Sequence, residues 1–202
     1  MRRRDLTLVL AVLVLTVTTF MSQPAYAQCT RASNAKLITA INSTTALLHW
    51  YETCADNSSA VYYQRSIDGL NTWTAPRTLF NLSDGRTAIR EFEGIMVGGG
   101  TLLTAMAIER GGLPSAIYVQ TSTNRGATWS APTLVREFGG SFGFCPVLDA
   151  SYEPKVGLFI LRTVIQQGDK AYVFLLKSPD GINWSWSRLG GSNFPLTCED
   201  DG

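Results

Sequence analysis

The stretch STNRGATW, from Ser122 to Trp129, occurs in variant form at two other places in the chain. Ser66 to Trp73 reads SIDGLNTW, and Ser178 to Trp184 reads SPDGINW. The three tryptophans lie 56 and 55 residues apart, so the motif marks a regular internal repeat. This repeat decides the fold that the sequence predicts.

Each copy contains the residue types of a tight turn. Ser and the Asp or Asn two positions later can accept hydrogen bonds from main-chain N–H groups. Glycine supplies a positive φ, and tryptophan covers the turn with an apolar ring whose N–H can still be bonded. We therefore assign a structural role to Ser66, Asp68, Gly69, Trp73, Ser122, Asn124, Gly126, Trp129, Ser178, Asp180, Gly181 and Trp184.

Strand-like segments recur in step with the motif. Alternating apolar runs rich in Tyr, Val, Phe and Ile precede the motif at 60–65, 116–121 and 171–177. A second run lies upstream of each, at 46–51, 101–108 and 156–161, and a third earlier still, such as 36–41 or 92–97. A short fourth run follows the motif at 78–80 and 133–135. Four strands per unit predict an all-β fold built from β-propeller blades.

The repeat divides the chain into three blades, at approximately 33–85, 86–140 and 141–190. Propellers usually close with four to eight blades, so three would form an incomplete ring. The segment 193–198 echoes 141–145 at the same period, which predicts that a fourth blade begins near Gly190. An open arc would leave two apolar blade faces in water.

The first 27 residues have the features of a secretory signal peptide. Three arginines at 2–4 precede an uncharged apolar run at 6–20, and Ala25-Tyr26-Ala27 predicts cleavage after Ala27. The apolar run is 15 residues long, shorter than the roughly 20 needed to span a bilayer. We expect residues 28–202 to be secreted or periplasmic, without stable membrane insertion after cleavage. A retained anchor is the alternative.

The charge balance gives no reason to expect a polyanionic partner. The chain has 17 basic and 16 acidic residues; cleavage removes three arginines and one aspartate, which leaves 14 and 15. We therefore expect neither nucleic acid nor a charged membrane surface as partner. No cofactor is indicated.

Four cysteines remain in the mature chain, an even number in an exported protein, which predicts disulfides. Three pairings are possible. Cys145 and Cys198 occupy equivalent positions at the entrances of neighbouring blades, which favours pairing them and leaves Cys29 with Cys54. No CxxC spacing occurs and His49 is the only histidine, so a Cys/His metal site is not expected.

STNRGATW resembles the Asp-box, or BNR repeat, of the sialidase superfamily, whose pattern is S/T-x-D/N-x-G-x-T-W. SIDGLNTW departs from it by an early glycine, and SPDGINW is one residue shorter. Three copies at near-constant spacing carry the resemblance over essentially all of residues 28–202. The resemblance implies a propeller whose Asp-boxes lie at the periphery, away from the active centre.

Sialidases, as the resemblance implies, remove terminal sialic acids with retention. Three arginines hold the substrate carboxylate, a tyrosine paired with a glutamate is the nucleophile, and an aspartate is the acid/base. Arg31 stands where the first arginine is expected, although Ala-Ser follows it where the family has Ile-Pro. Asp56, ten residues before Ser66, stands where the acid/base is expected.

The resemblance thus implies a carboxylate-binding role for Arg31 and an acid/base role for Asp56. The ordinary roles are the favoured interpretation: a solvated arginine and a turn-forming aspartate. Tyr152 and Glu153 are adjacent, but neighbours on a strand point to opposite faces, so we interpret them as a strand end before a turn at Pro154. His49 is expected to be half-buried with its hydrogen bonds satisfied.

Three functional hypotheses follow from the sequence. The first is a non-catalytic Asp-box propeller that binds a glycan or another cell-surface carbohydrate. The second is the N-terminal part of an exo-α-sialidase, a retaining glycoside hydrolase. The third is a half-propeller that is completed by homodimerisation. The scarcity of the family's active-site motifs favours the first.

Overall fold

The computed structural model describes residues 37–53, 59–82, 87–110, 113–138, 147–167 and 170–192. These residues form twelve strands and several of the turns between them, with no helix among the described residues. The strands are β1 (Leu37–Ala40), β2 (Ala46–Thr53), β3 (Ser59–Ser66), β4 (Arg77–Leu82), β5 (Thr87–Gly98), β6 (Thr101–Arg110), β7 (Leu113–Ser122), β8 (Thr133–Phe138), β9 (Val147–Glu153), β10 (Leu158–Gln167), β11 (Lys170–Ser178) and β12 (Ser185–Ser192).

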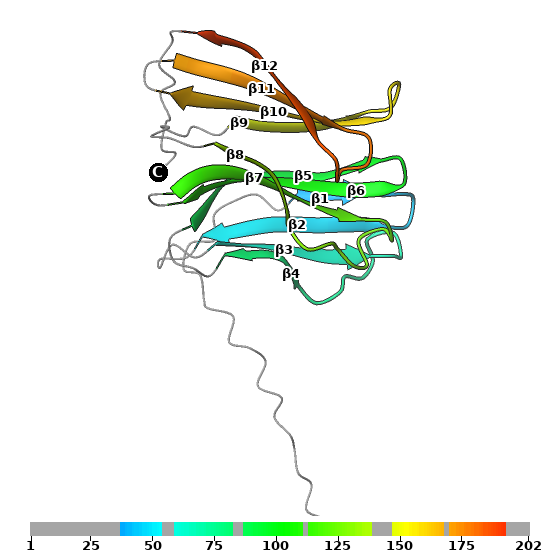
Figure 1. Cartoon of the computed structure of the whole chain (residues 1–202). Helices are drawn as coiled ribbons and strands as arrows, with labels where there is room; N and C mark the ends of the chain where they lie inside the picture. Colours follow the sequence, from blue (N-terminus) through cyan, green and yellow to red (C-terminus); the bar gives the residue numbers. More distant parts are fainter. Residues whose placement is uncertain are drawn as a thin grey trace, which may run out of the picture.

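The strands make three four-stranded antiparallel sheets, with the orders β1-β2-β3-β4, β5-β6-β7-β8 and β9-β10-β11-β12. We call them the first, second and third blades. Figure 1 shows them stacked face to face, with the second blade between the other two. The prediction of an all-β fold with three four-stranded blades is confirmed. The expected start of a fourth blade lies outside the described residues.

Most strands begin and end near the predicted positions. The run at 36–41 is observed as Leu37–Ala40, and the run at 133–135 opens the longer strand Thr133–Phe138. The run at 156–161 is a partial exception, because β10 begins only at Leu158. Gly157 has a positive φ of 67° and closes a turn onto the carbonyl of Glu153, so Val156 belongs to the turn.

The second blade is apolar on both faces, as the middle layer of a stack must be. Successive residues of β6 point to opposite faces of the sheet. Leu102 and Met106 pack towards the first blade, and Leu103 and Ala105 pack towards the third, all of them buried. This continuous apolar run differs from the simple alternation of a half-exposed strand.

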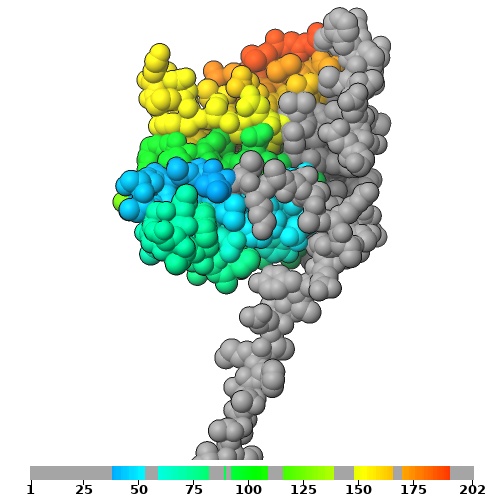
Figure 2. Space-filling model, turned by 180° about the vertical axis from the view of Figure 1, so that it is seen from behind, coloured from blue at the N-terminus to red at the C-terminus, as the bar shows by residue number. Residues whose placement is uncertain are grey.

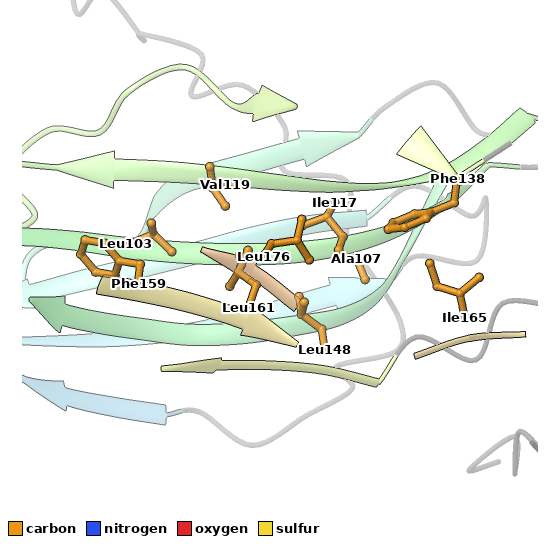
Figure 3. Close-up of a cluster of buried hydrophobic side chains, with 11 residues drawn as sticks. Leu103, Ala107, Ile117, Val119, Phe138, Leu148, Phe159, Leu161, Ile165 and Leu176 are labelled. Atoms are coloured by element: carbon orange, nitrogen blue, oxygen red, sulfur yellow. The ribbon is translucent and has the colours of Figure 1, made fainter. Parts of the chain in front are cut away.

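Two clusters of buried side chains hold the three blades together. One cluster joins the first and second blades and includes Leu47, Val61, Phe80, Ile95 and Met106. The other joins the second and third blades, where side chains from both sheets point into the space between them (Figure 3). Its buried members are Leu103, Ala105, Ala107, Ile117, Val119, Phe138, Leu148, Phe159, Leu161, Ile165 and Leu176.

The outer face of the third blade is partly exposed. Phe159 and Leu161 point into the cluster with the second blade, so Ile160 and Arg162 point to the other side of the sheet. Val173 of β11 is 36% exposed. The layered order of the blades is also visible in the space-filling view (Figure 2). Blade packing therefore buries one face of the third blade and leaves the opposite face half open.

Candidate functional site

The three repeated motifs, residues 66–73, 122–129 and 178–184, form turns at the ends of β3, β7 and β11; we call them the Ser–Asx turns. In the second blade, the Ser122 hydroxyl donates to Asn124 Oδ1 at 2.9 Å and accepts from the Gly126 N–H at 2.9 Å. Asn124 Oδ1 also accepts from the Thr128 N–H at 2.9 Å. The serine and asparagine side chains thus bond the main chain of their own turn.

The other two turns contain the same network with an aspartate. Ser66 Oγ donates to Asp68 Oδ1 at 2.9 Å, and Asp68 Oδ1 accepts from the Thr72 N–H at 3.0 Å. In the third blade, Ser178 Oγ donates to Asp180 Oδ1 at 2.9 Å. Asp180 Oδ1 then accepts from two N–H groups at 2.8 Å, those of Ile182 and Asn183.

These hydrogen bonds favour the ionised carboxylates. The side-chain hydrogen bond from Thr72, followed by its backbone N–H, lowers the pKa of Asp68 to about 2. The backbone N–H groups of Asn183 and Ile182 hold the pKa of Asp180 well below its usual range. A general acid needs a proton to donate near neutral pH, so neither aspartate suits that role.

Two of the turns also pack against the preceding blade. A Cβ atom placed on Gly126 would lie 2.7 Å from Leu47 Cδ1 of the first blade. A Cβ atom on Gly181 would lie 2.7 Å from Leu103 Cδ1 of the second blade. Both glycines have positive φ, 76° and 75°. These turns therefore serve as contacts between blades as well as hairpin connections.

Arginines of the first blade bond the second turn. Arg65 Nε donates to the Arg125 carbonyl at 2.9 Å, and an Arg77 guanidinium nitrogen donates to the Ala127 carbonyl at 3.4 Å. The sequence motifs alone do not reveal these contacts, because the partners are 60 and 50 residues apart. These two side chains thus connect neighbouring blades.

The motif tryptophans lie beside the blade interfaces. Trp129 packs on the cluster of the first two blades and stands edge-on to Tyr63, with ring centroids 6.1 Å apart. Trp184 packs on the other cluster, and its Nε1 donates to the Gly181 carbonyl at 3.2 Å. The buried Trp129 Nε1 has no hydrogen-bond partner among the described residues. Trp73 is half-buried.

The sequence-predicted catalytic residues, Arg31 and Asp56, lie outside the residues that the structure describes. The same holds for Cys29, Cys54, Cys145 and Cys198, so the disulfide pairing stays a prediction. Of the predicted site residues, the structure therefore places the members of the three Ser–Asx turns, each beside the end of its own hairpin.

Tyr152 and Glu153 end β9, as expected, and point to different surroundings. The Tyr152 ring packs on Phe159, with centroids 5.0 Å apart, and lies over Gly98. Glu153 Oε1 accepts from the Lys155 N–H at 3.1 Å in the following turn. This arrangement does not bring the phenol and the carboxylate together as a nucleophile pair.

Two further polar contacts lie in the first and third blades. Arg162 donates to Asp149 Oδ2 at 2.6 Å, with both side chains about half exposed. Glu52 Oε1 accepts from Trp50 Nε1 at 2.9 Å. The sequence did not indicate the ion pair between Asp149 and Arg162, because the two residues lie on different strands. It becomes predictable only when the register of β9 against β10 is known.

His49 differs from the expectation of a half-buried, hydrogen-bonded side chain. It is fully buried, and among the described residues neither ring nitrogen has a hydrogen-bond partner. The ring stands edge-on to Phe92, with centroids 5.5 Å apart. Desolvation lowers the pKa of His49 to about 4, so the ring is neutral at physiological pH.

Within the described part of the chain, no group of three or more His, Cys, Asp or Glu side chains is placed to hold a metal ion. Over the same residues, no helix is long and apolar enough to cross a membrane.

Comparison with solved structures identifies the fold. The chain is similar to the Hadza microbial sialidase Hz136, with a TM-score of 0.58, 15% identity and coverage of 77% of this chain. It spans 37% of the length of that sialidase. The prediction of a sialidase-like propeller fold is therefore confirmed, and at this low identity the similarity concerns the fold alone.

Weaker similarities connect the chain to two other glycosidase structures. An α-L-arabinofuranosidase from Fusarium graminearum has a TM-score of 0.47 at 14% identity, with 76% of this chain and 48% of that chain covered. A Bombyx mori β-fructofuranosidase has a TM-score of 0.44 at 14% identity, with 78% and 35% covered. No protein-family model and no curated protein sequence matches the chain.

Proposed function

We propose that the chain is part of an exported Asp-box propeller that binds a glycan or another cell-surface carbohydrate, and that it does not hydrolyse its ligand by itself. The sialidase-like fold of the described blades supports a carbohydrate as the class of ligand. A shared fold does not establish a shared reaction, so the reaction must be argued from the side chains.

The observation that carries this proposal is the structural use of the charged side chains. Asp68 and Asp180 bond their own turns. Arg65 bonds a neighbouring blade, and Arg162 is paired with Asp149. These groups stabilise the scaffold, which supports a binding function over a catalytic one for this part of the chain.

A further arginine is held between aromatic rings. The Arg136 guanidinium carbon lies 3.5 Å from the centroid of the Trp186 ring and 5.5 Å from the centroid of Phe174. Such cation–π contacts fix a guanidinium at an aromatic face. Trp186 is nevertheless 53% exposed, and an exposed indole is a suitable surface for stacking a sugar ring.

The proposed location follows from the N-terminal segment. Basic residues, an apolar run and the Ala25-Tyr26-Ala27 site support export with cleavage after Ala27, to the periplasm or the medium. Cys29, Cys54, Cys145 and Cys198 would then form disulfides in an oxidising compartment. Mass spectrometry of the exported chain tests both points at once.

The N-terminal part of an exo-α-sialidase is the second candidate. The similarity to a solved sialidase favours it, and it assigns Asp56 as acid/base and Arg31 as a ligand of the substrate carboxylate. In this case the chain would supply the first blades of a longer catalytic propeller. The two candidates differ in whether bound sialoside is cleaved.

One experiment separates them. The processed chain is tested for binding to a panel of immobilised sialylated and neutral oligosaccharides, and for release of 4-methylumbelliferone from its α-sialoside. We expect binding to at least one glycan without release of the fluorophore. Release that Asp56→Asn abolishes would establish the sialidase candidate. A folded chain that neither binds nor cleaves would refute the proposal.

A further inference from the structure

The three Ser–Asx turns share one structurally equivalent position. The hydroxyl of the first serine accepts a hydrogen bond from the N–H of Leu70 at 3.0 Å, of Gly126 at 2.9 Å and of Gly181 at 2.8 Å. The backbone at these three residues also has the same conformation, with φ of 73°, 76° and 75°. Leu70 therefore occupies in the first blade the place of a glycine in the other two.

Glycine is the residue that fits this position in the second and third blades without a shift of a neighbouring side chain. A Cβ atom on Gly126 or Gly181 would approach the side chain of Leu47 or Leu103 of the preceding blade to 2.7 Å. Heavy atoms that are not bonded do not come so close in a packed interior. The positive φ disfavours any other residue further.

The first blade has no such neighbour within the described part of the chain. Leu70 is 49% exposed, and a Cβ atom on the adjoining Gly69 would meet no heavy atom within 4 Å. By its equivalence to Gly126, Leu70 projects its side chain towards the place where a preceding blade would lie. The side chain of Leu70 therefore protrudes from this face of the first blade, at a position where both observed interfaces have a glycine.

The third blade offers the corresponding receiving position on its outer face. In each blade, the residue directly before the serine of the turn pairs in register with one residue of the neighbouring strand. These pairs are Arg65 with Leu47, Thr121 with Leu103, and Lys177 with Ile160. Ile160 is therefore the third-blade equivalent of Leu47 and Leu103. Its side chain points away from the second blade and is half-buried.

We propose that Leu70 makes the outer face of the first blade selective for a neighbouring blade that carries glycine or alanine at the position of Leu47. It excludes a second copy of this chain, which presents Ile160 there. In the interface geometry observed twice in this molecule, even the Cβ atom of residue 70 would collide with a large side chain. This inference is independent of the proposed function, and it opposes closure of the ring by homodimerisation.

The test uses a second copy of the chain as the probe. Molar mass is measured by light scattering during gel filtration over a range of concentrations, for the wild type, Leu70→Gly and Leu70→Ala. We expect a monomeric wild type and a dimeric Leu70→Gly variant. Leu70→Ala keeps the Cβ atom and should stay monomeric, which makes it the matched control.

Two more variants show whether pairing uses the proposed surfaces. Ile160→Ala shortens the receiving side chain and should permit pairing with Leu70 retained. Ile160→Glu, introduced together with Leu70→Gly, should restore the monomer because it places a charge in an apolar contact.

Two results would overturn the proposal. One is a folded Leu70→Gly variant that remains monomeric at every concentration. The other is a wild-type chain that already dimerises and that Ile160→Glu converts to a monomer. Circular dichroism establishes that each variant has retained the β-sheet fold.

Discussion

Gly126 of the second blade lies directly against Leu47 of the first, so closely that a Cβ atom on the glycine would stand 2.7 Å from Leu47 Cδ1. The same relation recurs between Gly181 and Leu103 one blade later. The glycine of the second turn and the glycine of the third turn are thus each fixed by two requirements at once, a positive φ and the approach of the neighbouring blade. Different substitutions can separate these requirements.

We expect Gly126→Ala to destabilise the chain more than Gly69→Ala. Both residues have positive φ, 76° and 71°, and alanine in that conformation costs about 1–2 kcal/mol. Only at Gly126 does the added methyl group meet a packed side chain, which adds about 1–3 kcal/mol of overpacking. Urea denaturation should show that the free energy of unfolding falls by roughly 2–5 kcal/mol in Gly126→Ala and by roughly 1–2 kcal/mol in Gly69→Ala.

Gly69→Ala is the matched control, because no heavy atom lies within 4 Å of the place its methyl group would take. Equal losses in the two variants would mean that backbone strain explains the whole effect. The contact with Leu47 would then have no energetic consequence, contrary to the prediction.

The Ser–Asx turns predict a component of acid destabilisation. The pKa of Asp68 is lowered to about 2 and that of Asp180 lies well below its usual range. Folding therefore favours the ionised form of both side chains. Their stabilising contribution is complete above the unfolded pKa near 4 and is lost as pH falls towards 2. We expect the double variant Asp68→Asn, Asp180→Asn to lose less thermal stability between pH 5 and 2.5 than the wild type.

The second blade provides the reciprocal variant. Asn124 already makes the same main-chain contact as the aspartates, so Asn124→Asp should form an equivalent turn that now titrates. Its melting temperature should fall more steeply with acid than that of the wild type. If the melting temperature of all three proteins fell by the same amount between pH 5 and 2.5, these carboxylates would not be the source of the acid sensitivity.

Much of the fold could be predicted from periodicity. The tryptophan spacing and the alternating runs predicted three four-stranded blades, because each strand has a local pattern and each turn a local motif. The start of β10 was misplaced by two residues, since Val156 is apolar but lies in a turn. Local hydrophobicity cannot distinguish a strand residue from an exposed turn residue of the same type.

Contacts between blades were not predictable in the same way. Nothing local to Gly126 indicates Leu47, and nothing local to Leu70 shows that it takes the place of a glycine at a blade interface. His49 was expected to be half-buried in an apolar strand, yet its face of β2 is covered by the second blade. Such features depend on which sheets meet, and that information is spread over the whole chain.

His49 should make stability depend on pH between 7 and 4. Its pKa is lowered from 6.5 to about 4 by burial, so the unfolded chain binds the proton more readily than the folded chain. Stability is therefore highest above pH 6.5 and falls on acidification, by about 2 kcal/mol at pH 5 from this group. In His49→Leu the loss of unfolding free energy between pH 7 and 5 should shrink by that amount.

The comparison is specific because His49 is the only histidine in the chain. At pH 7 the leucine variant should be as stable as the wild type or more stable, since the substitution removes two buried nitrogens without partners among the described residues. Two outcomes would contradict the assignment: an unchanged pH dependence, or an imidazole that titrates near 6.5 by NMR.

Tyr152 should act through packing and not through its hydroxyl group. Its ring lies 5.0 Å from the Phe159 centroid and covers Gly98, so Tyr152→Ala should cost about 2–4 kcal/mol in urea denaturation. Tyr152→Phe keeps the ring and should change stability by less than about 0.5 kcal/mol. Glycan binding should also persist in Tyr152→Phe, because the phenylalanine ring keeps the packing on Phe159 and Gly98. If Tyr152→Phe abolished binding or turnover while the fold stayed intact, the phenol would have to reach the ligand, and packing alone would not account for the role of this residue.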